Sequence, residues 1–201
     1  MKKLDKLNVA YGSIQPPLTS GAPIQPFTLP MTLLSLFHVT IPSPLDPSPL
    51  PLLRSLHLDD QTCQPIQLLL PQLASLRIKG LLDLTDLGSL IQASTSITSL
   101  ALYERFIARL DDASQTFVKK RIVEFSIQVS IYSESSNSTL ATIVTGSNVM
   151  KKVILDALPL SVQDQVKPRY LETLKVVKAA CKKKKIELWK ENFDTGNGKV
   201  D

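Results

Sequence analysis

The sequence predicts an α/β fold in which short strand-and-return units stack into a right-handed solenoid, with a parallel sheet on its concave side. Two hexapeptides, Leu53–Leu58 and Leu73–Ile78, repeat one apolar spacing twenty residues apart. In both, the last two apolar residues alternate with polar ones, as in a strand with one buried face. A unit of about twenty residues with a single strand cannot bury its own apolar side chains, so it must stack on further copies.

Further copies of this hexapeptide occur along the chain. They begin at Leu4, Met31, Ile97, Ile122 and Met150, and a weaker copy begins at Lys183. The steps between successive copies are 27, 22, 20, 24, 25, 28 and 33 residues. Most are close to the spacing of about 20 to 29 residues that is typical of leucine-rich repeats.

The chain therefore resembles the leucine-rich repeat family from Leu4 to about Trp189. The helix-then-strand pattern of Tyr170–Trp189 also resembles the end of fungal F-box-associated repeat proteins. This resemblance implies a protein-protein interaction module, with substrate recognition for an F-box-type ubiquitin ligase as its specific role. No helical F-box is predicted ahead of the first strand, and the family's turn asparagines are replaced, so the repeats should be irregular.

The segments between the strands differ along the chain. Twelve of the 14 prolines lie between Pro16 and Pro71, which predicts extended loops on the convex side of the early repeats. Short helices are expected there later, at 83–93 and 103–121, and an exposed loop at 133–139. Pro168 should begin the last helix. We therefore expect irregular repeats over 1–167, followed by a helix and a last strand over 168–201 that act as a cap.

The sequence shows no pattern that indicates catalysis, a cofactor or a metal site. It has two histidines and two distant cysteines, Cys63 and Cys181, and no nucleotide-binding, zinc-binding or nucleophile motif. We therefore expect a protein without enzymatic activity. No secretory signal or run of about 20 apolar residues occurs, which predicts a soluble protein of a reducing compartment, in the cytoplasm or the nucleus.

The third, fifth and seventh positions of each hexapeptide unit should face the concave surface, since the fourth and sixth face the core. Five such residues on neighbouring strands form the predicted partner-binding patch: His57, Asp59, Arg77, Lys79 and Tyr103. Side chains of these types carry much of the binding energy at protein interfaces. The simpler interpretation is that every strand of such a sheet exposes polar residues. The sequence also predicts an uncovered first strand, completed by a preceding region or by a capping partner.

A second function class depends on the basic end of the chain. Residues 168–201 hold nine Lys or Arg against five Asp or Glu, including Lys182, Lys183, Lys184 and Lys185. At a helix C-terminus these lysines complement the partial negative charge of the helix. The alternative is that they bind a nucleic acid or another anionic surface. From the sequence we favour a protein partner over a nucleic acid.

Overall fold

The computed structural model describes residues 6–10, 31–37, 47, 50–59, 64–79, 87–129, 136–156, 163–192 and 196–200. It confirms an α/β fold with mostly parallel strands. The chain divides into two compact units, Met1–Ile97 and Thr98–Asp201, and each is described by itself. In the described part of the chain, no helix combines the length and the apolar character needed to cross a membrane.

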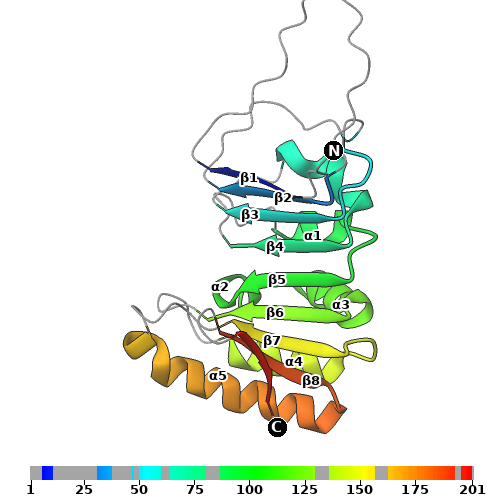
Figure 1. Ribbon diagram of the computed structural model, residues 1–201. Helices are drawn as coiled ribbons and strands as arrows, with labels where there is room; N and C mark the ends of the chain where they lie inside the picture. Colours follow the sequence, from blue (N-terminus) through cyan, green and yellow to red (C-terminus); the bar gives the residue numbers. More distant parts are fainter. Residues whose placement is uncertain are drawn as a thin grey trace, which may run out of the picture. The chain divides into compact units, whose positions relative to one another are not determined.

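The first unit contains four parallel strands, each paired with its neighbour in sequence (Figure 1). They are β1 (Lys6–Ala10), β2 (Leu33–Phe37), β3 (Ser55–Asp59) and β4 (Ser75–Ile78). The hexapeptides fall in register, because Leu34, Leu56 and Leu76 are successive partners across β2, β3 and β4. All three are buried, so one face of these strands forms the core.

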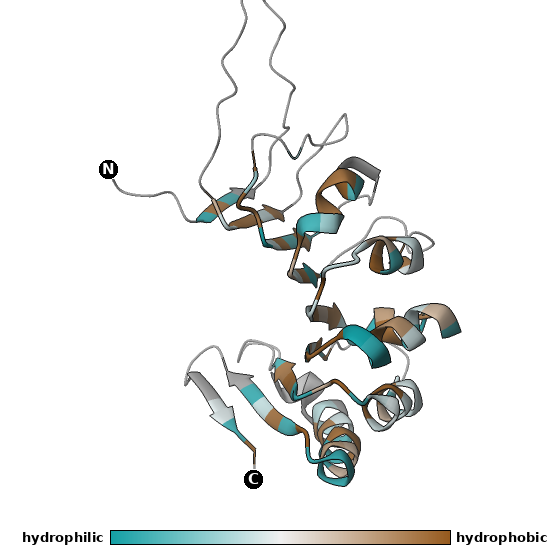
Figure 2. Cartoon of the chain, turned by 90° about the vertical axis from the view of Figure 1, so that its right-hand side faces the viewer, coloured by the Kyte–Doolittle hydropathy of each residue, from teal (hydrophilic) through white to brown (hydrophobic). Residues whose placement is uncertain are grey.

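In the described residues of the first unit, two helical segments return the chain, η1 (Gln64–Gln72) and α1 (Leu87–Ala93). Both lie on the same side of the strands (Figure 2). The expectation of extended structure in the proline-rich part was wrong for η1, which is a 3-10 helix. Burial of Ile66, Leu69 and Leu70 explains the difference, since each fully buried aliphatic side chain stabilises the fold by about 1.5 to 3 kcal/mol. Of the helix expected over 83–93, residues 83–86 lie outside the described residues, and α1 covers the rest.

The second unit contains five strands, of which the first four are parallel. They are β5 (Ser99–Tyr103), β6 (Glu124–Gln128), β7 (Lys152–Asp156), β8 (Glu187–Asn192) and the antiparallel β9 (Gly196–Lys199). Leu100, Phe125, Val153 and Leu188 are successive partners. The eighth hexapeptide placed Ile186 opposite Val153, two residues before the true partner Leu188. The strand starts later than predicted, at Glu187, because the helix continues to Lys184. The strand β9 was not predicted.

The described part of the second unit has four helices, α2 (Glu104–Ile107), α3 (Asp112–Arg121), α4 (Asn137–Gly146) and α5 (Gln163–Lys184). The single helix expected over 103–121 is broken, since Asp111 caps a new helix by accepting a hydrogen bond from the Ser114 N–H at 2.8 Å.

Two further expectations about these helices were wrong. The loop expected at 133–139 was wrong from Asn137, where α4 begins, because Leu140, Ile143 and Val144 recur at helical spacing and are buried. Residues 133–135 of this loop lie outside the described part of the chain. The last helix begins at Gln163, five residues before Pro168. A proline this close to a helix start removes only one intrahelical hydrogen bond, to the Asp164 carbonyl.

The predicted boundary between repeats and cap lies at residue 167, whereas the two compact units meet between Ile97 and Thr98. In the second unit α5 packs on α4, and β8 pairs with β7. The helix and the last strands therefore continue the layers of this unit. Whether they act as a cap stays a prediction.

Candidate partner-binding face

The exposed face of β3 and β4 holds four of the five predicted patch residues. His57 and Arg77 are register partners, and both are half-exposed. Asp59 ends β3, and Lys79 follows β4, where its backbone N–H donates to the Leu58 carbonyl at 2.8 Å. This bond continues the β3–β4 pairing past Ile78, so the positions of all four residues are set by regular strand backbone.

His57 is the best-defined member of this face. Its Nδ1 lies 3.4 Å from the Oγ of Ser35, which is its register partner on β2 and is 2% exposed. Burial is the main cause that lowers the pKa of His57 from 6.5 to about 4, and the positive charges of Arg77, Lys79 and Lys6 contribute the rest of the shift. The imidazole is therefore neutral at pH 7 and serves as a polar, uncharged group among cations.

The charge of this face is positive. Lys6, Arg77 and Lys79 all act on the His57 ring, and Asp59 is the one carboxylate among the patch residues of the first unit. Lys6 was missed from the sequence, because the patch was chosen from the fifth and seventh positions alone. Lys6 lies at the third position of the first hexapeptide, which was also expected to face the concave surface. Ser35 was assigned to the row of fifth positions, but its burial beside His57 could not be predicted from the sequence.

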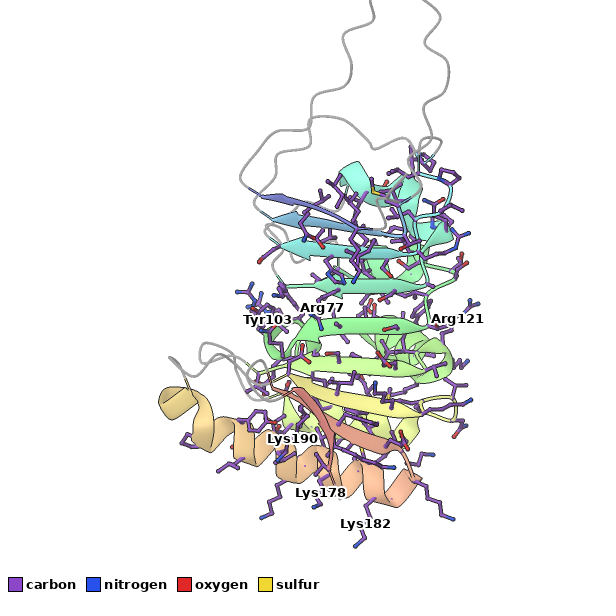
Figure 3. The ribbon with its side chains drawn as sticks, viewed as in Figure 1. Arg77, Tyr103, Arg121, Lys178, Lys182 and Lys190 are labelled. Atoms are coloured by element: carbon purple, nitrogen blue, oxygen red, sulfur yellow. The ribbon has the colours of Figure 1, made fainter. Side chains whose placement is uncertain are left out.

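Tyr103, the fifth predicted residue, belongs to the second unit. It ends β5 and is half-buried, with its ring edge-on to Phe106 at a centroid distance of 6.4 Å. The Arg105 guanidinium lies 5.7 Å from the centroid of the Tyr103 ring, a geometry in which a cation is attracted to an aromatic face. Figure 3 labels Tyr103 and Arg77. Membership of Tyr103 in the patch stays a prediction.

The fifth and seventh positions of the second unit are less exposed than expected. Ser126, Gln128, Ile154 and Asp156 on β6 and β7 are all buried. The Ser126 hydroxyl donates to Asp156 Oδ1 at 2.9 Å, so a buried carboxylate has a hydrogen-bond partner as its desolvation requires. The expectation of a uniformly solvent-facing row of polar residues was wrong for these two strands.

The four predicted lysines lie at the end of α5. Lys182, Lys183 and Lys185 are exposed, whereas Lys184 is half-exposed and its Nζ donates to Asn148 Oδ1 at 3.3 Å. Among the described residues, no group of three or more His, Cys, Asp or Glu could hold a metal ion.

No protein-family model, no curated protein and no solved structure matches this chain.

Proposed function

We propose that this chain is a non-enzymatic leucine-rich-repeat solenoid that binds a protein partner through the exposed face of β3 and β4. The order of the strands supports the proposal, because each strand in a unit pairs in parallel with the next strand of the sequence. In a solenoid each repeat contacts only its neighbours, and its strands build an extended binding surface.

The observation that carries the proposal is the rigid group of His57, Arg77 and Lys79. Their backbones are held in paired strands, so ordering them for a partner costs little conformational entropy. The cations suit an acidic partner surface, and the neutral imidazole can donate or accept a hydrogen bond there. Arg is also enriched among residues that dominate interface energies.

The experiment is affinity capture from an extract of the source organism with the wild-type chain and with Arg77→Ala/Lys79→Ala. A matched control, Arg109→Ala/Lys175→Ala, removes the same charge from exposed positions of the second unit. Proteins recovered by the wild type and the control but lost with the patch variant are the expected partners. The same recovered set for all three chains would refute the patch.

The more specific role is substrate recognition for an F-box-type ubiquitin ligase, and the family resemblance is its support. It predicts that ligase subunits are recovered together with the chain, and that their recovery is the same for Arg77→Ala/Lys79→Ala. The substrate should be lost with that variant. A partner that is recovered without any ligase subunit would refute the ligase role and leave the binding face supported.

A further inference from the structure

Basic side chains from three separate stretches of the sequence meet at one edge of the second unit. Where a helix returns to a parallel strand, the C-terminus of the helix and the start of the strand lie at the same edge. The ends of α3, α4 and α5 and the starts of β6, β7 and β8 therefore share an edge (Figure 1). We call eight cations of this edge the basic rim and leave out Lys152, which pairs with Glu124; the eight are Lys119, Lys120, Arg121, Lys151, Lys182, Lys183, Lys184 and Lys185.

Side-chain contacts connect the three stretches. The Ser147 hydroxyl at the end of α4 donates to the Lys119 carbonyl at 2.8 Å, and a side chain at Gly146 would meet Lys119 Cδ at 3.1 Å. From the other side, Lys184 reaches Asn148 as described above. Lysines of α3 and α5 thus reach the uncharged end of α4 from both sides.

The backbone continues this connection along the strands. The Lys151 N–H donates to the Val123 carbonyl before β6 at 2.9 Å, and the Glu187 N–H at the start of β8 donates to the Lys151 carbonyl at 3.0 Å. Since packed helices lie about 8 to 10 Å apart, and α4 packs on both α3 and α5, the rim extends over about 20 Å.

The rim has a strong local excess of positive charge. Six of its side chains are exposed: Lys120, Arg121, Lys151, Lys182, Lys183 and Lys185. The neighbouring acids, Glu124 and Glu187, pair with Lys152 at 3.2 Å and with Lys199 at 2.8 Å, and neither of these lysines is counted in the rim. Figure 3 shows Arg121 at this edge and Lys182 on the outer side of α5, pointing away from the strands.

A simpler account is that the cations only complement helix C-termini, where each contributes about 0.3 to 1 kcal/mol. This account covers the last turns of α3 and α5. It does not cover Lys151, which precedes a strand, or Lys185, which lies beyond α5 with φ of 58°. Non-glycine residues rarely adopt this conformation, and such strain occurs preferentially at functional sites.

The composition of the rim favours one class of partner. Protein interfaces are depleted in Lys, and seven of the eight rim cations are Lys. Membrane-surface binding combines cations with an inserted apolar side, but the exposed large apolar residues of the described chain are Leu52, Leu68 and Leu171. The first two belong to the other unit, and Leu171 precedes Lys185 by about 20 Å of helix. Phosphate groups need only point charges, which Lys supplies.

We propose that the basic rim binds the phosphate backbone of a nucleic acid duplex without reading its sequence. A length of about 20 Å matches about six phosphates along one strand, at about 3.4 Å each. This surface extends well beyond the four lysines that the sequence singled out, and it is separate from the face formed by His57, Arg77 and Lys79.

The test measures fluorescence anisotropy of a labelled DNA duplex of about 30 base pairs with the full chain. If four phosphates are contacted, raising salt from about 50 to 200 mM should increase the dissociation constant about 100-fold. In Lys151→Gln/Lys183→Gln we expect about tenfold weaker binding at low salt, and a logarithmic salt slope smaller by about 1.8. The control Arg109→Gln/Lys175→Gln removes equal charge outside the rim and should change the affinity less than about twofold.

Three results would overturn the proposal. One is the absence of duplex binding at about 50 mM salt, with both variants melting like the wild type. Another is equal weakening by the rim variant and the control, which would show that net charge alone governs binding. The third is rim-dependent binding to vesicles containing about 30% anionic lipid that is tighter than binding to the duplex, which would assign the rim to a membrane surface. None of these results bears on the partner-binding face of the first unit.

Discussion

Replacement of Lys185 by glycine should stabilise the chain. Lys185 follows α5 with φ of 58°. Its N–H donates to the Lys182 carbonyl at 3.4 Å, and the Ile186 N–H donates to the Cys181 carbonyl at 3.0 Å. This is the paired backbone bonding of the Schellman motif, in which the left-handed position is usually glycine. Both bonds come from the backbone, so they remain when the side chain is removed.

The expected gain is the difference between two opposing effects. A left-handed conformation costs a residue with a Cβ about 1 to 2 kcal/mol, and glycine avoids this cost. Glycine also has more conformational freedom in the unfolded chain, and this entropy offsets about 0.5 to 1 kcal/mol of the stabilisation. Lys185→Gly should therefore be more stable by about 0.5 to 1 kcal/mol, which corresponds to a Tm higher by about 1 to 4 °C for a chain of this size.

The assay is thermal unfolding followed by circular dichroism, at about 0.5 M salt to screen the neighbouring lysines. Lys185→Ala is the matched control, because it removes the same charge and keeps the Cβ that causes the strain. We expect Lys185→Gly to melt above Lys185→Ala. Equal melting temperatures for the two variants would refute the strain at Lys185 and the argument built on it.

Three other predictions concern single residues. His57 should make the stability of the chain depend on pH: its pKa is lowered in the folded state to about 4 from 6.5, so stability is intact above pH 6.5 and is lost as the pH falls toward 4. For a fully buried ring this pKa shift would change the free energy of unfolding by about 3 kcal/mol, and partial exposure of the His57 ring to solvent reduces the change to about 1 to 2 kcal/mol. Urea unfolding at several pH values should show a weaker pH dependence of stability for His57→Gln than for the wild type, and the same pH dependence in both would contradict the assignment to His57. Leu76→Ala should cost about 2 to 5 kcal/mol, since Leu76 is fully buried, while Arg77→Ala beside it should cost less than about 1; equal losses would mean that the strand faces are reversed. Cys181 is buried and its pKa is raised to about 11, so in a Cys63→Ala background alkylation at pH 8 should be slow until the chain unfolds, and rapid labelling of the native chain would show that α5 detaches.

The strands could be predicted from the sequence because each hexapeptide carries its own signal. Leucines at the fourth and sixth positions identify both the strand and its buried face, and parallel pairing in register follows when the units stack. Leu56 and Leu76 are register partners for this reason. The signal failed at Lys183, where an apolar position was missing and the helix continued through the predicted start of the strand.

The return segments could not be predicted as well, because their local preferences conflict with their packing. Prolines in η1 and β-branched residues in α4 both disfavour helix. Each segment nevertheless buries several aliphatic side chains on its unit, and this burial outweighs the local preference. The burial of Ser126 and Asp156 was also not predictable, because their hydrogen bond joins residues that are 30 positions apart in the sequence.

The full extent of the basic rim could also not be predicted from the sequence. In the sequence its cations form three clusters, Lys119–Arg121, Lys151 and Lys182–Lys185, separated by about 30 residues, and most of them, taken one by one, are accounted for by the C-terminus of a helix. Parallel strand-and-helix units place these positions at the same edge each time, so charges that are ordinary one by one add to a continuous surface. Lys185 is the point at which the local and the collective explanations differ. If its side chain served only the end of α5, glycine would be the better residue there. If it serves the rim, Lys185→Gly should raise the melting temperature and weaken duplex binding in the same protein. A rise in stability with unchanged duplex affinity would remove Lys185 from the binding surface.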